Sequence, residues 1–184
     1  MDSVTGLPSQ RAAVHLEELA PETFQDYCDI GKQAYNEHYL HLWPNSDPTP
    51  YFESSFTFDV LENELKNPNT RLYIIRKGSL GIGILKLVID KGIHTHPPKI
   101  SMLLEKIYVL NKHTGKGCGL EVLKLVETYA KSLGKTILWL DTMQKGRAYS
   151  FYTQHGFSIV QEKELPFKES LPKERGMFLL IKEF

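Results

Sequence analysis

The sequence contains little cysteine, has no excess of charge of either sign and lacks long apolar runs. Its only cysteines are Cys28 and Cys118, and two cysteines so far apart do not form the framework of a disulfide-stabilised protein. The 22 basic residues balance the 22 acidic residues, which leaves no electrostatic case for nonspecific binding to nucleic acid. No segment reaches the roughly 18 consecutive apolar residues of a membrane-spanning helix. We therefore expect neither nucleic acid nor a membrane as a partner.

The start of the sequence lacks the apolar core of about 7 to 15 residues that a secretory signal peptide needs. This favours a cytoplasmic protein, with residues 1–10 frayed, as chain ends commonly are. No repeat, low-complexity segment or linker divides the remainder, so we expect residues 11–184 to form one domain with its own core. The sequence leaves open whether that domain forms a homodimer.

Hydrophobic periodicity divides the chain into strand-like and helix-like segments. Strands are expected where apolar residues alternate or form short runs between turn residues, and helices where they recur three and four positions apart. On this basis strands are predicted over 12–20, 71–77, 79–90, 97–110, 135–141, 157–165 and 176–184, and helices over 21–43, 51–67, 117–133 and 146–156. This order of elements predicts a single α/β domain with a mixed sheet.

Three glycines stand at alternate positions where the helix over 117–133 begins: Gly115, Gly117 and Gly119. Glycine inside a helix costs about 1 kcal/mol relative to alanine, so propensity does not explain them. A helix N-terminus offers unpaired backbone N–H groups and partial positive charge, and glycines let that backbone approach a phosphate closely. The loop therefore predicts a site for a phosphate-bearing ligand. The alternative is a tight turn without a ligand.

Two common nucleotide motifs do not describe this loop. A Walker loop requires G-x-x-x-x-G-K-S/T, which is absent. The dinucleotide fingerprint requires G-x-G-x-x-G early in a βαβ unit, whereas the spacing here is G-x-G-x-G after several strands. A different kind of phosphate-binding loop is indicated.

The segment EKIYVLNKHTGKGCGLEVLKLVETYAKSLGKTILWLD resembles the GNAT family of acyl-CoA-dependent N-acetyltransferases, and the resemblance extends over roughly residues 70 to 184. The pyrophosphate loop of that family reads Gln/Arg-x-x-Gly-x-Gly/Ala. Gly117 and Gly119 match its two glycines, whereas Thr114 replaces the usual Gln or Arg. Because the backbone donors do not depend on that side chain, the loop is still expected to bind the coenzyme phosphates.

A second family motif, Asn-x-x-Ala-x-x-Phe-Tyr followed by Gly-Phe, is matched in RAYSFYTQHGF. Ala148, Phe151 and Tyr152 fall on their expected positions, and Lys145 stands where Asn is common. The resemblance implies a GNAT-like fold, a mixed and mostly antiparallel sheet of about seven strands flanked by about four helices, with a splayed central strand pair. It also implies acetyl-CoA as co-substrate, without a metal, and direct acetyl transfer to an amine.

The resemblance also implies the residues that contact the coenzyme. These are Ile107, Val109, Thr114, Gly115, Lys116, Gly117, Cys118, Gly119, Lys145 and Tyr152. The Val109 N–H is the expected donor to the thioester oxygen, and the Tyr152 phenol is the expected acid for the departing thiolate. A core aromatic is the alternative interpretation of Tyr152.

Glu105 is the predicted general base, acting directly or through water, because a carboxylate in the apolar strand LLEKIYV is rarely buried without a reason. Strand alternation predicts that residues 103, 105, 107 and 109 share one face. A carboxylate at the rim of the sheet is the alternative.

The acceptor pocket is expected at the aromatic N-terminal part. A long helical start, a Trp followed by a turn and the segment ESSF…LENEL resemble the branch of the family that acetylates spermidine and related polyamines. Aromatic faces suit ammonium groups, so the predicted pocket residues are Tyr35, Tyr39, Trp43, Tyr51 and Glu105, with Glu37, Asp47 and Glu53 as further acids. An ordinary helical core with solvated charges is the alternative.

The histidines do not complete a metal-ligand set at a reliable spacing. The sequence thus predicts an acetyl-CoA-dependent N-acetyltransferase for a primary amine of a small molecule, with a polyamine as first candidate. A protein or peptide N-acetyltransferase and a non-catalytic acyl-CoA sensor are the alternatives.

Overall fold

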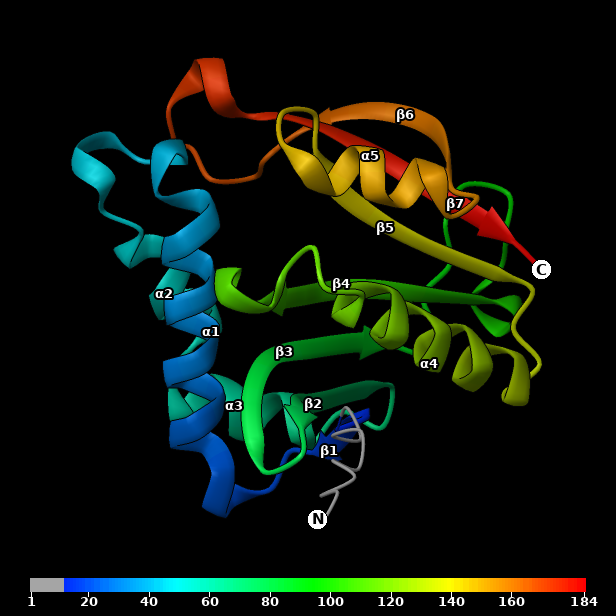
Figure 1. Ribbon diagram of the computed structural model, residues 1–184. Helices are drawn as coiled ribbons and strands as arrows, with labels where there is room; N and C mark the ends of the chain where they lie inside the picture. The colour runs from blue at the N-terminus through cyan, green and yellow to red at the C-terminus, as the bar shows by residue number, and fades with distance from the viewer. Residues whose placement is uncertain (1–11) are drawn as a thin grey trace, which may run out of the picture.

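The computed structural model describes residues 12–184, which form one seven-stranded sheet with helices on both faces (Figure 1). The strand order is β1-β2-β3-β4-β5-β7-β6, and only the β4–β5 pair is parallel. The strands are β1 (Val14–Glu18), β2 (Thr70–Lys77), β3 (Leu80–Val88), β4 (Ser101–Val109), β5 (Ile137–Met143), β6 (Ser158–Glu164) and β7 (Gly176–Glu183).

Two groups of helices cover the sheet. Helices α4 and α5 pack on one face through an apolar cluster that includes Val122 and Tyr152, whereas α1, α2 and α3 pack on the other through a cluster that includes Tyr35 and Phe56 (Figure 1). The helices are α1 (Phe24–Tyr39), α2 (Thr49–Ser55), α3 (Phe58–Leu65), α4 (Cys118–Ser132) and α5 (Arg147–Gln154). No helix within residues 12–184 combines the length and apolar character needed to cross a membrane.

The predicted fold class is confirmed, but two predicted elements differ from those observed. The helix expected over 51–67 is interrupted at Phe56, which leaves the helical conformation, and Thr57 caps α3 by accepting a hydrogen bond from the Val60 N–H. The strand expected over 97–110 begins only at Ser101, because Pro97 and Pro98 lead into a short 3-10 turn. The predicted fraying of residues 1–10 lies outside the described residues.

The centre of the sheet is split. Strand β4 pairs with β5 only through Ser101–Leu103 and Ile137–Trp139, whereas β5 pairs with β7 along its whole length. The two central strands separate beyond that point (Figure 1). The predicted splayed pair is confirmed, and its gap opens where β4 runs into the glycine loop.

A β-bulge changes which side chains of β4 face the gap. Lys106 pairs with Lys86 and Leu104 with Leu87, so Glu105 is an extra residue in β4. As a result Ile107 packs with the α4–α5 cluster, the cluster that also holds Leu104. The prediction that residues 103, 105, 107 and 109 share one face is wrong, because strict alternation fails at the bulge.

Candidate active site

The glycine loop connects β4 to α4 in an open conformation. Gly115 and Gly117 have φ angles of 67° and 85°, in the left-handed region that glycine adopts without strain. A Cβ atom at either position would meet no atom within 4 Å. Among the described residues no side chain caps the start of α4, so its first N–H groups are free to bind an anion. The loop therefore fits the phosphates of the predicted coenzyme.

The other loop residues have distinct roles. The Thr114 hydroxyl donates to the Asn111 carbonyl at 2.8 Å and so stabilises the turn before the loop. Cys118 is buried in the core, with its sulfur 4.0 Å from the Lys77 ammonium. Lys116 is exposed, and a side chain at Gly119 would lie in ordinary contact with the ring of Phe151. The side chains of Thr114 and Cys118 thus support the loop itself, whereas the glycines, the Cys118 N–H and Lys116 leave backbone and charge available to a ligand.

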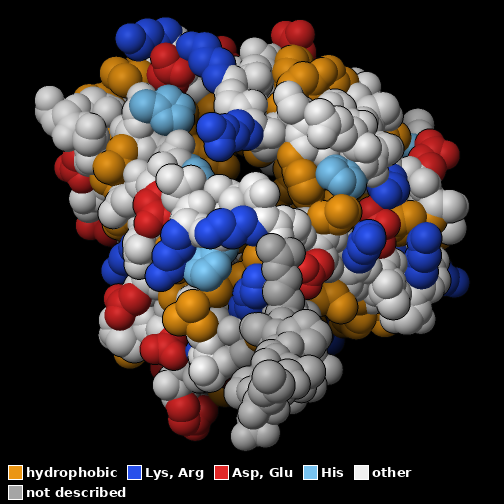
Figure 2. Space-filling view, in the orientation of Figure 1, with side chains coloured by type: hydrophobic (Ala, Val, Ile, Leu, Met, Phe, Trp, Pro, Cys, Tyr) orange, Lys and Arg blue, Asp and Glu red, His pale blue; other side chains and the backbone are white. Residues whose placement is uncertain are grey.

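Lysines surround His113 beside the loop. Burial, together with Lys112, Lys116 and Lys77, lowers the pKa of His113. Figure 2 shows lysine and histidine side chains gathered on the face where this loop lies. Sequence analysis missed Lys77 because it lies in β2, 41 residues before Cys118. The positive charge at the loop suits a polyphosphate ligand.

The end of β4 presents backbone groups to the gap. The Leu110 N–H donates to the Ile82 carbonyl at 2.9 Å, and backbone groups alternate along a strand, so the N–H and C=O of Val109 point away from β3. The Val109 carbonyl is held by His38 Nε2 at 2.9 Å, which requires the proton on that nitrogen. The Asn111 N–H donates to Glu37 at 2.6 Å. Helix α1 therefore fixes the strand end with the Val109 N–H facing the gap.

Tyr152 lies on α5 and lines the space between the separated strands. Its ring packs against Phe151 and Phe157. Burial, and to a lesser degree Tyr39, raises the pKa of Tyr152, which keeps the phenol protonated at neutral pH. Lys145, at the start of the same helix, is largely exposed and pairs with Glu174 at 3.0 Å.

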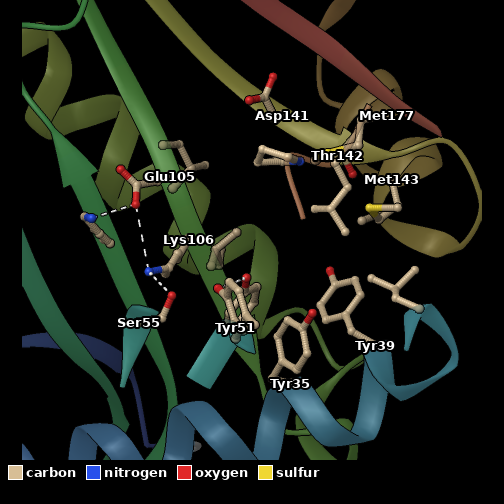
Figure 3. A pocket seen from close by; sticks show the side chains of 18 of the residues that line it. Tyr35, Tyr39, Tyr51, Ser55, Glu105, Lys106, Asp141, Thr142, Met143 and Met177 are labelled. Atoms are coloured by element: carbon tan, nitrogen blue, oxygen red, sulfur yellow. Dashed lines mark hydrogen bonds and ion pairs between the residues drawn. The ribbon is translucent and has the colours of Figure 1, made fainter. Parts of the chain in front are cut away.

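A cavity of about 340 Å³ occupies the gap, and the segment 165–167 between β6 and β7 borders it (Figure 3). Of the predicted pocket residues, Tyr35, Tyr39, Tyr51 and Glu105 line it, and its lining also includes Ile107, Tyr108, Tyr152, Lys86, Lys106 and Asp141. Trp43 lies behind this lining and donates its indole N–H to the Tyr35 hydroxyl at 2.9 Å. Glu37 accepts a hydrogen bond from the Asn111 N–H, as described above, and Asp47 accepts one from the Thr49 hydroxyl.

Four charged side chains form a balanced cluster on one wall of the cavity. Lys86 contacts Glu105 at 2.6 Å and Glu64 at 2.7 Å. Burial alone would lower the pKa of Lys86, but these two carboxylates outweigh burial and raise it. Lys106 lies beside this trio, 3.9 Å from Glu105 and 3.3 Å from the Ser55 hydroxyl (Figure 3).

Lys106 is buried between aromatic rings, with its ammonium 5.7 Å from the centres of Tyr51 and Phe56. Burial and the neighbouring Lys86 lower the pKa of Lys106 to about 8. Sequence analysis missed Lys106 because strict alternation puts neighbouring residues on opposite faces of a strand. The bulge instead brings Lys106 to the cavity beside Glu105.

Asp141 lies on β5 across the gap. Its Oδ2 accepts from Lys163 at 2.7 Å, and its Oδ1 is buried without a hydrogen-bond partner among the described residues. The three carboxylates that line the cavity, Glu64, Glu105 and Asp141, each contact a lysine. Within residues 12–184 no group of three His, Cys, Asp or Glu side chains could hold a metal ion.

Comparison with known proteins identifies relatives of this arrangement. The profile of the acetyltransferase (GNAT) family matches residues 32–157. The uncharacterized N-acetyltransferase in the pepI 3′ region of Lactobacillus delbrueckii subsp. lactis is 19% identical over 150 residues, which cover 81% of this chain and 87% of that protein.

Solved structures share the fold at low sequence identity. PaiA N-acetyltransferase from Thermoplasma acidophilum in complex with coenzyme A superposes with a TM-score of 0.72 and 17% identity, over 94% of this chain and 99% of that one. A spermidine N-acetyltransferase chimera from Vibrio cholerae and hSSAT superposes with a TM-score of 0.68 and 14% identity, over 92% and 95% of the two chains. These likenesses establish the fold.

Proposed function

Because this chain belongs to the GNAT family of acetyltransferases, we propose that it transfers the acetyl group of acetyl-CoA directly to the primary amine of a small molecule. The family establishes an N-acetyltransferase that uses acetyl-CoA. The observation that supports a small-molecule acceptor is the cavity of about 340 Å³ between the separated strands, which the segment 165–167 borders. Such a volume suits a small ligand, whereas a protein or peptide acceptor would need an open groove.

The glycine loop and its lysines would bind the coenzyme phosphates. The free N–H groups at the start of α4 and the charges of Lys77, Lys112 and Lys116 support this assignment. Acetyl-CoA supplies the activated acetyl group as a thioester. The Val109 N–H faces the gap and would donate to the thioester oxygen, with Ile107 beside it. Lys145 remains a predicted coenzyme contact.

Tyr152 would donate a proton to the departing thiolate sulfur. Its burial keeps the phenol protonated, and it lines the cavity in which we propose that the acetyl group is transferred. Phe151 and Phe157 fix the ring, which supports a defined direction for the hydroxyl.

Glu105 would accept the proton that the attacking amine loses, directly or through water. It lines the cavity and contacts Lys86 at 2.6 Å. The bulge in β4 gives this side chain its direction.

Polyamines are the narrower candidate from the sequence, and spermidine N-acetyltransferase chimeras are among the fold neighbours. The lining of the cavity does not favour a polycation, because each carboxylate there already contacts a lysine. A polyamine would have to displace these lysines or bind outside the cavity.

A thiol-release assay with acetyl-CoA tests the proposal. The acceptor panel contains spermidine, monoamines, amino acids and short peptides, and mass spectrometry checks each product for one added acetyl group. We expect acetylation of a small primary amine. Acetylation of peptides alone would indicate the protein acetyltransferase, and coenzyme binding without thiol release from any acceptor would indicate a sensor. Better turnover of spermidine than of monoamines, lost at high salt, would restore the polyamine assignment.

A further inference from the structure

We propose that the acceptor carries a carboxylate in addition to its reacting amine, and that Lys106 binds this carboxylate. This inference rests on the proposed function and specifies the acceptor class for the same cavity. An amino acid or a related amino carboxylate has the required chemistry and fits the cavity of about 340 Å³.

Lys106 lacks the partners that a buried ammonium needs. An ammonium has three donors, but among residues 12–184 Lys106 makes one hydrogen bond, at 3.3 Å to Ser55. Its nearest carboxylate is 3.9 Å away, and that carboxylate, Glu105, already contacts Lys86 at 2.6 Å. Burying such a charge is costly unless another group pairs with it. A ligand carboxylate in the cavity would supply this missing partner.

Tyrosine hydroxyls add further donors to the same wall. Tyr51 and Tyr108 share one hydrogen bond of 2.6 Å, which leaves one of their two O–H protons free to donate. The Tyr35 hydroxyl accepts from Trp43 and keeps its own proton for a further bond. Burial raises the pKa of Tyr35 and of Tyr51, so both phenols remain donors at neutral pH. A wall rich in donors selects a ligand group with several acceptor atoms.

The charges around Lys106 also favour an anion. Lys86 on β3 and Lys106 on β4 place two ammonium groups around Glu105, while Glu64 contacts Lys86. Because Glu105 and Glu64 are both committed to Lys86, Lys106 is the charge left to be compensated. A further cation would supply no acceptor for the Lys106 ammonium, so a polyamine tail does not suit this wall.

Binding of a carboxylate should couple to proton uptake. The charged and titratable groups that face Lys106 are Lys86 on β3, Glu105 on β4, Glu64 on α3 and Tyr51 on α2. The pKa of Lys106 is about 8, so above that pH the free side chain is largely neutral. A ligand carboxylate favours the ammonium, so binding above pH 8 takes up a proton and weakens as the pH rises.

Matched acceptors test the proposal in the wild-type protein. Each set contains an amino acid, its amide and the amine without the carboxyl group, built on alanine, leucine, phenylalanine and lysine. We expect the free amino acid to have the highest kcat/KM, by at least about tenfold, in one or more sets. If the amine or the amide is equal or better in every set, the inference is overturned while the proposed function stands. Absence of acetylation in all sets and in the wider panel would overturn both.

The variant Lys106→Met assigns the preference to this side chain, because methionine retains most of the aliphatic stem without the charge. We expect the ratio of kcat/KM for amino acid over amine to fall at least about tenfold. Lys182→Met is the matched control, since Lys182 is partly buried and paired with Glu127 at 2.6 Å outside the cavity. A preference that persists in a folded Lys106→Met protein would overturn the assignment.

Titration calorimetry at pH 8.5 in buffers of different ionisation enthalpy gives a second readout. Binding of the preferred amino acid should take up protons in the wild type and in Lys182→Met, and take up fewer in Lys106→Met. Equal proton uptake in all three proteins would also overturn the assignment to Lys106.

Discussion

The coenzyme side and the acceptor side of the site are built in different ways. The proposed coenzyme side centres on one continuous segment, 107–119, with its backbone N–H groups and glycine conformations, to which β2 adds Lys77 and α5 adds Tyr152. The acceptor side collects side chains from α1, α2, α3, β3, β4, β5 and the segment 165–167. The first can therefore be recognised as a motif, whereas the second depends on how the whole chain folds. We therefore expect substitutions of the loop glycines to impair coenzyme binding, and substitutions of the cavity side chains to impair turnover of the acceptor.

The largest expected effect is that of Gly117→Glu on coenzyme binding. The new carboxylate would lie where phosphate is expected, and the left-handed φ of 85° disfavours any side chain by about 1–2 kcal/mol. We expect the affinity for acetyl-CoA to fall roughly a thousandfold, measured by calorimetry.

Gly134→Glu is the matched control for Gly117→Glu. Gly134 follows the other end of α4, has a φ of 71° and has no atom within 4 Å of an added Cβ. It should suffer the same backbone strain without loss of coenzyme binding. Equal affinities of the two folded variants would disprove the role of the loop.

Tyr152→Phe is expected to leave coenzyme affinity unchanged and to lower kcat about 10²- to 10³-fold, because only the proton donor is removed. Tyr149→Phe on the same helix, where the ring packs on Phe178, should retain the wild-type rate. This variant separates a side-chain role from the backbone contacts of the coenzyme side. A Tyr152→Phe enzyme with wild-type kcat would mean that the ring serves only for packing.

Glu105→Gln is expected to lower kcat/KM by about a hundredfold, since the amide cannot accept the amine proton. The loss should shrink at high pH, where a larger share of the acceptor amine is already neutral. Glu127→Gln removes a carboxylate with the same 2.6 Å lysine contact away from the cavity and should leave the pH profile unchanged. A uniform loss at every pH in Glu105→Gln would point to a structural carboxylate instead.

The smallest expected effect concerns stability and again involves Lys106. Its pKa is about 8 in the folded chain and about 10.4 when unfolded, so between these values the unfolded chain binds more protons. The free energy of unfolding should therefore rise with pH in this window. From pH 7.5 to 9 the wild type should gain about 1 kcal/mol relative to Lys106→Met, measured by urea denaturation. If the free energy of unfolding changed with pH in the same way in both proteins, the lowered pKa of Lys106 would be contradicted.

The contrast between the coenzyme side and the acceptor side also explains which parts of the structure can be predicted from the sequence. The glycine loop, the Tyr152 motif and the order of elements along the chain follow from local patterns, because turn residues and periodicity act within a few positions. The fold class, the splayed strands and the family agree with those predictions.

The charged wall of the cavity could not be predicted in this way. Lys86, Lys106 and Glu64 come together through strand pairing and helix packing between distant segments. Lys106 follows Glu105 in sequence, so strict alternation would place it on the opposite face. Nothing in the local pattern signals the extra residue in β4, and the acids chosen from sequence, Glu37 and Asp47, bind backbone or a hydroxyl elsewhere.

The bulge at Glu105 determines which charged side chains of β4 face the cavity together. With the extra residue, a carboxylate and an ammonium face the acceptor side by side. Loss of one residue between Ser101 and Glu105 would remove the bulge and restore strict alternation. Lys106 would keep its face, whereas the Glu105 carboxylate would be lost or turned toward the α4–α5 side. A relative of the same fold and the same glycine loop could thus lose the carboxylate beside this lysine through a single-codon deletion, without any substitution in the cavity itself.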